Sequence, residues 1–237
     1  TITDTSANLA AASAASANGA TSLTASDNAT GAQASAIAAF TSTSTYNISD
    51  TSANLGLDAT TTAGLNGAGT IAATGSAVTA AIATKLLSAT NSGATTIAAV
   101  TDTSSAVKAL SIPTGDVITT LTASGTSTIA DAVTINAIGA GTTAFATVSG
   151  SGADIISNIT VSAKATNVTV TGTVTAAQAK TINDADDGDG DTAYTYSISD
   201  TYENLMLDAA QDGTFDYAAA MVDATTITVT DDLNLAQ

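Results

Sequence analysis

The sequence has no cysteine, no histidine and no arginine, and each absence excludes a class of site. Without cysteine there are neither disulfides nor thiolate metal centres, and without histidine the commonest general base and metal ligand is missing. Serine–histidine catalysis is therefore excluded. Because nothing else in the sequence resembles a nucleophile paired with a base, we predict that the chain is not an enzyme.

Positive charge is scarce as well. Four lysines oppose 21 acidic residues, which gives a formal net charge of −17 at pH 7. Nucleic acids and anionic membrane surfaces are both bound through clustered Lys and Arg, so we expect no nucleic-acid partner. We also expect no membrane insertion, since no run reaches the roughly 18 consecutive apolar residues of a membrane helix. The excess of carboxylates instead favours solubility and attracts divalent cations.

Large core-forming side chains are few. Aromatic residues make up 3% of the chain, tryptophan is absent, proline occurs once, and much of the 44% apolar content is alanine. A single wide globular core is hard to build from such a composition. Regularly spaced Ile, Val and Leu nevertheless argue against disorder, so we expect a thin core that is repeated along the chain.

One short motif recurs through the whole sequence, with a second motif between its copies. The first reads ITDTSANL, ISDTSANL, VTDTSSAV, VSGSGADI and ISDTYENL, and its leading residues are Ile2, Ile48, Val100, Val148 and Ile198. The second begins at Leu23, Ile71, Leu121, Val168 and Ile227, in contexts such as LTASDNATGAQA and VTVTGTVTAAQA. Two interleaved motifs that share one period indicate a solenoid or array.

Each half-repeat predicts one strand followed by one short helix. Residues 166–173 and 225–231 have the period-two alternation of strands, whereas residues 76–89 and 174–184 have helical spacing and a high alanine content. We therefore expect a mixed β/α solenoid of parallel strands and short helices, similar to leucine-rich repeats, with an all-β parallel solenoid as the alternative. The predicted domain is a single elongated solenoid of five repeats, at 1–45, 46–97, 98–145, 146–193 and 194–237.

The recurring polar residues of the first motif are predicted to build turns. Asp4, Asp50, Asp102 and Asp200 stand between strand and helix, where an acidic or hydroxyl side chain caps the helix by accepting an orphan N–H. Asn8, Asn54 and Asn204 hold one register, and we expect them to bond backbone groups of neighbouring coils. Calcium bridging between the aspartates and ligand binding by the asparagines remain open alternatives. The fourth copy, VSGSGADI, lacks the Asp–Thr pair, so we expect it to be the least regular.

One stretch, NDADDGDGDTAY at 183–194, is chemically specialised. Five carboxylates within eight residues, loosened by two glycines, form the oxygen-rich loop that Ca²⁺ prefers. The spacing matches neither an EF-hand nor the haemolysin-type nonapeptide, and a solvated acidic connection is the alternative interpretation. The candidate calcium ligands are Asp184, Asp186, Asp187, Asp189 and Asp191.

The alternation of strand-DTxANL and TVTAAQA resembles the repeat regions of very large bacterial secreted and cell-surface proteins, of the β-strand-repeat and haemolysin type found in cyanobacteria and proteobacteria. The resemblance covers essentially the whole chain and weakens around residues 139–160. It implies an extracellular, calcium-associated structural role in a cell-surface layer, stalk or filament. It also leads us to expect a piece of something longer, because residue 1 opens directly into a repeat.

We therefore expect an extracellular structural protein whose coils stack and which assembles head-to-tail with further copies of itself or with adjoining repeats. The alternative is an adhesin that binds calcium, a glycan, a mineral surface or ice. Threonine-rich alternations such as TSTST at 41–45 suggest the ice-binding variant, although threonine also simply suits the exposed face of a strand.

Overall fold

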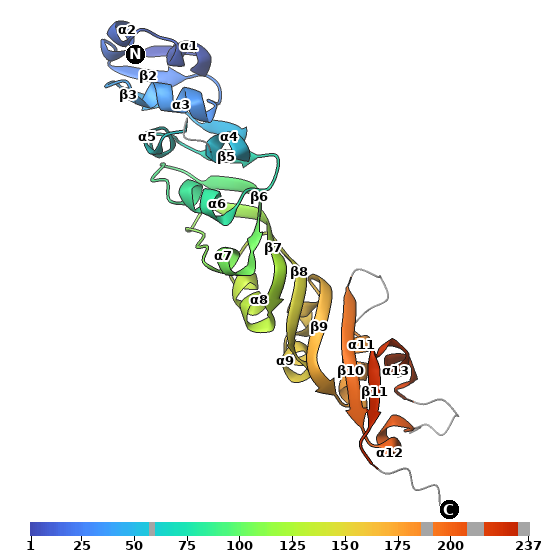
Figure 1. Ribbon diagram of the computed structural model, residues 1–237. Coiled ribbons are helices and arrows are strands. Elements are labelled where there is room, and N and C mark those ends of the chain that lie inside the picture. Colours follow the sequence, from blue (N-terminus) through green and yellow to red (C-terminus); the bar gives the residue numbers. More distant parts are fainter. Residues whose placement is uncertain (57–59, 186–191, 208–215, 232–237) are drawn as a thin grey trace, which may run out of the picture. The chain divides into compact units, whose positions relative to one another are not determined.

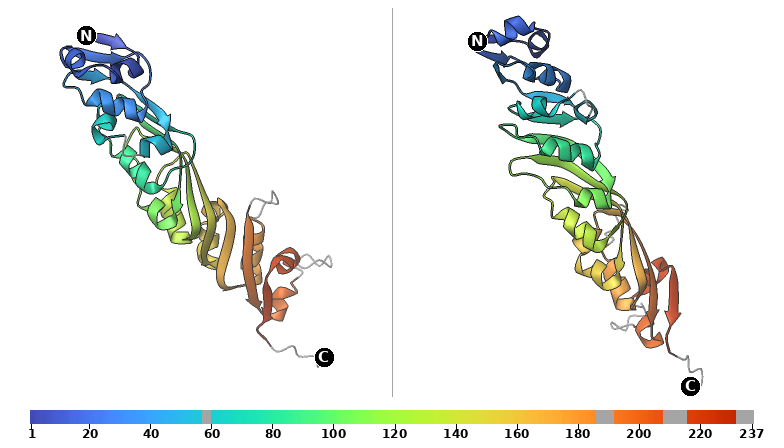
Figure 2. Two further views of the ribbon diagram at one scale, coloured as in Figure 1. Left: turned by 45° about the horizontal axis from the view of Figure 1, so that its top comes forward. Right: turned by 60° about the vertical axis from the view of Figure 1, so that its left-hand side comes forward.

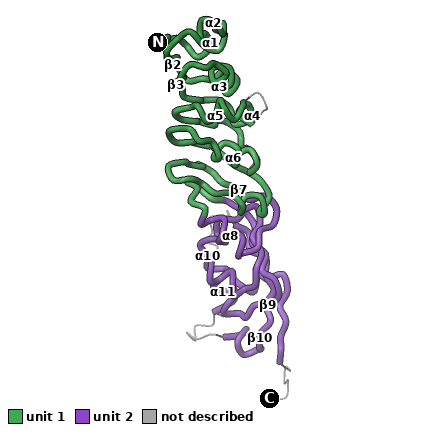
Figure 3. Tube along the Cα trace, turned by 90° about the vertical axis from the view of Figure 1, so that its left-hand side faces the viewer, with its two compact units in different colours: residues 1–122, 138–143 green, residues 123–137, 144–237 purple. Residues whose placement is uncertain are grey.

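A computed structural model describes residues 1–56, 60–185, 192–207 and 216–231. The chain divides into two compact units, drawn in different colours in Figure 3. Unit 1 comprises residues 1–122 and 138–143, and unit 2 comprises residues 123–137 and 144–237. The sequence predicts that the same residues form one solenoid domain of five repeats.

Short strands and short helices alternate along both units (Figures 1 and 2). In the first 122 residues they are β1 (Ile2–Asp4), α1 (Ser6–Ala10), α2 (Ala14–Asn18), β2 (Ser22–Ala25), α3 (Gly31–Ala38), β3 (Thr43–Thr45), β4 (Ile48–Thr51), α4 (Ser52–Gly56), α5 (Thr62–Asn66), β5 (Ile71–Thr74), α6 (Ala80–Leu87), β6 (Thr95–Thr103) and α7 (Ser104–Lys108). β7 (Val117–Thr128) contributes residues to both units.

The remaining elements belong wholly or mainly to unit 2. They are α8 (Ile129–Asn136), β8 (Thr142–Ser151), α9 (Gly152–Ser157), α10 (Ile159–Ser162), β9 (Ala165–Val174), α11 (Ala176–Asn183), β10 (Ala193–Asp200), α12 (Tyr202–Leu205), α13 (Ala218–Asp223) and β11 (Thr226–Val229).

The strands form parallel sheets in which neighbours in the sequence are neighbours in space. One sheet has the order β1-β2-β3, and a sheet of eight strands has the order β11-β10-β9-β8-β7-β6-β5-β4. Parallel pairing requires a crossover between strands, and the short helices supply it. The protein is thus mixed α/β with parallel strands, and the all-β alternative is wrong because a helix follows nearly every strand.

The strand register aligns the two sequence motifs. Ile2 pairs with Leu23 and Ile48 with Ile71 in unit 1, and Ile198 pairs with Ile227 in unit 2. Each of these pairs joins the leading residue of a first motif to the leading residue of the next second motif. The half-repeats measured in the sequence are therefore neighbouring strand–helix units.

A threonine begins most of the helices. Its hydroxyl accepts a hydrogen bond from the backbone N–H three residues later, which satisfies one of the orphan donors of the first helical turn. These N-cap threonines are Thr5, Thr30, Thr61, Thr79, Thr103, Thr128, Thr175 and Thr201. In the fourth copy of the first motif, which lacks the Asp–Thr pair, Ser151 caps α9 in the same way.

The core is thin, and the helices of the two motifs contribute different buried residues to it. Helices of the first motif bury one large residue in the fourth position, namely Leu9, Leu55, Val107, Ile155 and Leu205. The eight-residue helices of the second motif bury an alanine there and a large residue three positions later, as in the pairs Ala34 and Ile37, Ala83 and Leu86, Ala132 and Ile135, and Ala179 and Ile182. Facing large and small side chains allow successive helices to pack closely.

Candidate functional site

The aspartates of the first motif lie at the point where a strand ends and a helix begins. One carboxylate oxygen of Asp4, Asp50 and Asp102, Oδ1, accepts the backbone N–H of the following threonine at 2.7 Å, and Oδ1 of Asp200 does so at 2.9 Å. The threonine in turn caps the helix. The turn position predicted from the sequence is thus a bonded strand-to-helix corner.

The second carboxylate oxygen reaches into the preceding half-repeat. Oδ2 of Asp50 accepts the N–H of Gly31 at 3.0 Å, Oδ2 of Asp102 accepts that of Ala80 at 3.0 Å, and Oδ2 of Asp200 accepts that of Ala176 at 2.9 Å. Gly31, Ala80 and Ala176 are the first residues of α3, α6 and α11. A negative charge at a helix N-terminus is favourable, because orphan N–H groups and the helix dipole both point at it. Each of these aspartates therefore joins two half-repeats.

Two further aspartates play the same part and were missed by sequence reasoning. Asp27 Oδ1 accepts the N–H of Ser6 at 2.6 Å, and Asp231 Oδ1 accepts the N–H of Tyr202 at 2.7 Å. Ser6 and Tyr202 begin α1 and α12. The signal was present in the sequence, since both aspartates stand four residues after the leading residue of a second motif.

The asparagines of the first motif bond within their own half-repeat. The side-chain amides of Asn8, Asn54 and Asn204 donate to Oδ1 of the aspartate four residues earlier, at 2.8, 2.8 and 2.7 Å. Their backbone N–H groups donate to the capping threonine. The expected bonds to the backbone of neighbouring coils are therefore wrong, because the aspartate one helical turn away is a nearer, charged acceptor.

These bonds stabilise the ionised form of Asp4 and Asp200. Burial raises the pKa of Asp200, but the bonds from the Asn204 amide and from the N–H groups of Ala176 and Thr201 outweigh it, so that the pKa lies below its ordinary value. The Asn8 amide and the Thr5 N–H likewise lower the pKa of Asp4. Carboxylates held in this way serve as fixed anionic caps.

Two buried tyrosines each add a hydrogen bond within their own half-repeat. Tyr46 and Tyr196 each stand two residues before the leading residue of a first motif. The hydroxyl of Tyr46 donates to the carbonyl of Gly64 in α5, and that of Tyr196 donates to the carbonyl of Ala220 in α13, both at 2.9 Å. Burial raises the pKa of Tyr46 to about 12. The hydroxyls thus hold α5 in unit 1 and α13 in unit 2.

The predicted calcium loop falls mostly outside the described residues. Asp186, Asp187, Asp189 and Asp191 lie there, and only Asp184 of the five candidates can be placed. Asp184 follows the end of α11 and accepts a salt bridge from Lys180 at 2.7 Å. Within the described residues no three acidic side chains gather into a group that would hold a metal ion. Calcium therefore remains a prediction from the sequence.

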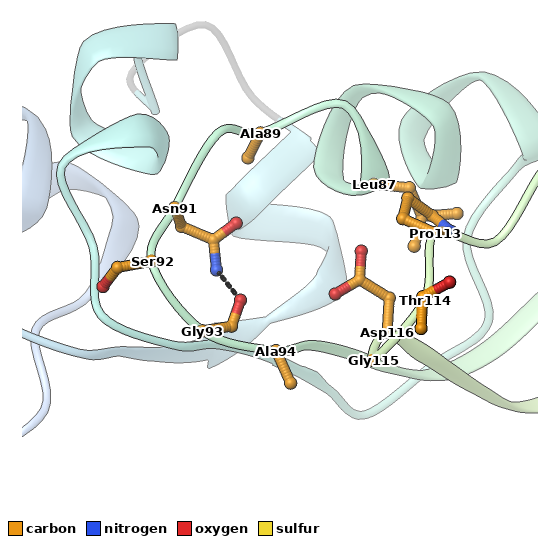
Figure 4. Close-up of a pocket in the computed structure, with 10 residues that line it drawn as sticks. All are labelled: Leu87, Ala89, Asn91, Ser92, Gly93, Ala94, Pro113, Thr114, Gly115 and Asp116. Atoms are coloured by element: carbon orange, nitrogen blue, oxygen red, sulfur yellow. Dashed lines mark hydrogen bonds between the residues drawn. The ribbon is translucent and has the colours of Figure 1, made fainter.

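A pocket of about 400 Å³ opens in unit 1 between the connections that follow α6 and α7 (Figure 4). The side chains of Asn91 and Asp116 turn toward its interior, with Leu87 and Pro113 on one side. Asp116 Oδ1 accepts the Thr95 N–H at 2.7 Å, and the Asn91 amide donates to the Gly93 carbonyl at 2.7 Å. The backbone thus orients a carboxylate and an amide that both line this pocket, with an apolar wall on one side.

Among the described helices there is none that combines the length and the apolar character needed to cross a bilayer. No family model matches the chain, and neither a curated protein nor a solved structure matches it.

Proposed function

We propose that this chain is a structural repeat protein of the extracellular cell surface, in which half-repeats stack as a mixed β/α solenoid within a surface layer, stalk or filament. The observation that carries the proposal is the repeated link between half-repeats through Asp50, Asp102 and Asp200. Carboxylates that bind helix N-termini at the same position of successive repeats have a structural role. In such an architecture each unit contacts its neighbours and the stability is a sum of these contacts.

Composition supports the surface location. The chain is acidic, free of cysteine and rich in small polar residues, and its motifs resemble the repeats of large bacterial surface proteins. Antibodies raised against the chain and applied to intact cells of the source organism test the location. We expect labelling of intact cells, and electron microscopy of the labelled material should show a layer or filament. Labelling that requires cell lysis would overturn the proposal.

A binding module is the second candidate function, and the pocket around Asn91 and Asp116 favours it. Its volume suits a sugar of one or two rings, and an amide and a carboxylate in its lining suit hydroxyl groups as donor and acceptor. A glycan array probed with the whole chain and with the Asp116→Ala variant tests this candidate. Binding that is present in the chain and absent in the variant supports it, whereas equal signals for both argue against it.

Calcium binding is proposed for the acidic stretch at 184–191. A ligand that binds only the folded chain must raise its melting temperature. Thermal unfolding in millimolar Ca²⁺ and in chelator therefore gives a direct test, with Mg²⁺ as the control for general screening of charge. Equal midpoints in calcium and chelator would remove calcium from the proposal.

A further inference from the structure

Two side chains of α6 reach across to α4 in unit 1. Ile82, the third residue of α6, lies over Gly56, where an added Cβ atom would be 2.8 Å from the Ile82 Cδ1 atom. Lys85, the sixth residue, extends to the end of α4, and its Nζ donates to the carbonyls of Leu55 at 3.3 Å and Thr60 at 3.0 Å. An ammonium group thus binds the carbonyl end of this helix, where a positive charge is favourable.

The same two positions of α11 carry side chains that fold back onto their own helix. In unit 2, α11 packs on α9 as α6 packs on α4. Gln178 is the third residue of α11, and its Oε1 accepts the N–H of Thr175 at 3.0 Å. Thr181 is the sixth residue, and its hydroxyl donates to the carbonyl of Ala177 at 3.1 Å. Both side chains are therefore directed along α11 and not across to α9.

A pocket of about 360 Å³ opens between α9 and α11 as a result. Its lining residues are Ala153, Ile156, Ser157, Ala177, Gln178 and Thr181. The carbonyl end of α9 lies where α4 meets the ammonium group, with Ile155 as the counterpart of Leu55. The Ile155 carbonyl accepts the N–H of Asn158 at 3.1 Å and has a second lone pair for a further donor. The pocket thus combines hydrocarbon walls with oxygen acceptors.

We propose that this pocket binds a primary alkylammonium group, in the place that Lys85 fills between α6 and α4. The alkyl chain lies over Ile156 and Ala177, and the ammonium group donates to the carbonyl of Ile155 and the hydroxyl of Ser157. Lysine side chains bury their carbon chain and keep the charged end at polar groups in the same way. The formal net charge of −17 attracts such cations. This binding role goes beyond the proposed structural function.

The first test is calorimetric titration of the whole chain with n-butylammonium chloride, which reproduces the carbon chain and the ammonium group of a lysine side chain. About 0.15 M salt screens the general attraction of cations to the acidic surface. We expect binding to saturate at one site with millimolar affinity, as suits so small a ligand. Tetramethylammonium has the same charge and no N–H donor, so it should bind at least about tenfold more weakly. Equal binding of the two cations would overturn the proposal.

Thr181→Lys supplies the ligand from the chain itself. The introduced side chain should fill the pocket, so that butylammonium binding falls at least about tenfold and the melting temperature rises. Thr134→Lys is the matched control, because Thr134 is the sixth residue of α8 and its hydroxyl also donates to the carbonyl four residues earlier. The control adds the same charge and should keep the binding. Undiminished binding in folded Thr181→Lys, checked by circular dichroism, would overturn the proposal.

The converse variant, Lys85→Thr, should create a second site of the same kind between α6 and α4. We expect its melting temperature to fall, and titration should then show two butylammonium sites in place of one. Competition against butylammonium identifies the source of the amine. Tighter binding of N-acetyl-lysine methylamide assigns the pocket to a lysine of a partner protein, whereas tighter binding of 1,4-diaminobutane assigns it to a free aliphatic amine. If neither competes, the proposal is wrong.

Discussion

Two joints in unit 2 connect neighbouring half-repeats by opposite chemistry. At the first joint, Asp200 accepts the N–H of Ala176 at the start of α11. At the second, Gly150 occupies the aspartate position and faces Ile129 at the start of α8. A Cβ atom on Gly150 would lie 2.7 Å from the Ile129 Cγ2 atom. The large side chain of Ile129 thus takes the place that the carboxylate fills at the first joint.

The two joints show that the contact between neighbouring half-repeats is kept while the two residues that form it change together. Where an aspartate of the first motif meets a helix of the second motif, the helix starts with a glycine or alanine, as in Asp50 with Gly31 and Asp102 with Ala80. A glycine goes with an isoleucine. The polar joint gains a charge-assisted bond to a helix N-terminus, and the apolar joint gains buried hydrocarbon. Each pair fills the same space.

The largest expected effects come from changing either residue of the apolar joint. Gly150→Asp places a side chain against Ile129 with no space to receive it, and overpacking of this kind costs about 1–3 kcal/mol. We expect a loss of about 2 kcal/mol or more in the free energy of unfolding, measured with denaturant.

The paired exchange tests the explanation. Ile129→Ala alone leaves a cavity and should cost about 2–5 kcal/mol. With Gly150→Asp added, the aspartate has room to accept the N–H of residue 129, so the double variant should lose clearly less than the two single losses combined. Simple additivity would mean that the two residues do not share one space.

The polar joint is expected to be somewhat less sensitive. Asp200→Ala removes the acceptor of three donors, one of them at the start of α11, and loss of a helix cap costs about 0.5–2 kcal/mol. We expect a loss near the upper end, about 2 kcal/mol, in denaturant unfolding. Asp184→Ala is the matched control, since the Asp184 carboxylate forms a salt bridge with Lys180 on an exposed surface, where such a pair contributes about 0–1 kcal/mol. Equal losses in the two variants would contradict the special role of Asp200.

The period and the turn residues could be predicted from the sequence because they depend on local chemistry. A short strand, an aspartate and a threonine cap follow one another within a few residues of Ile48 or Ile198, and the structure places them so. Parallel pairing and the alternation of strand with helix follow from the same pattern. The all-β alternative failed because the alanine-rich segments form capped helices.

The hydrogen-bond donor to each carboxylate could not be predicted, since it depends on which half-repeat packs next to the aspartate. Asp200 and Ala176 are 24 residues apart, and only the stacking of α11 against β10 brings them together. The asparagine prediction failed for a related reason, because Asn204 finds Asp200 one helical turn away before any neighbouring strand. The acceptors of the two tyrosine hydroxyls likewise could not be predicted, because they depend on where the bonded helices lie.

Acid should weaken the polar joint and leave the apolar joint unchanged. The pKa of Asp200 is lower in the folded chain than its ordinary value of 3.8. Its contribution to stability is therefore complete above about pH 4 and is lost as the pH falls through the lowered folded value. Denaturant unfolding of the chain and of Asp200→Asn, from about pH 7 to about pH 2, measures the difference. That difference should shrink only below about pH 4, and a constant difference would contradict the linkage.

The smallest expected effect concerns the side chain that steadies Asp200. Asn204 is exposed and donates to Asp200 Oδ1 at 2.7 Å, so Asn204→Ala removes one hydrogen bond and leaves the bond to Ala176 in place. We expect a loss of about 0.5–1 kcal/mol in the wild-type background. In the Asp200→Ala background the same substitution should cost almost nothing, because the acceptor is already gone. A loss of equal size in both backgrounds would mean that Asn204 acts through helix propensity rather than through the aspartate.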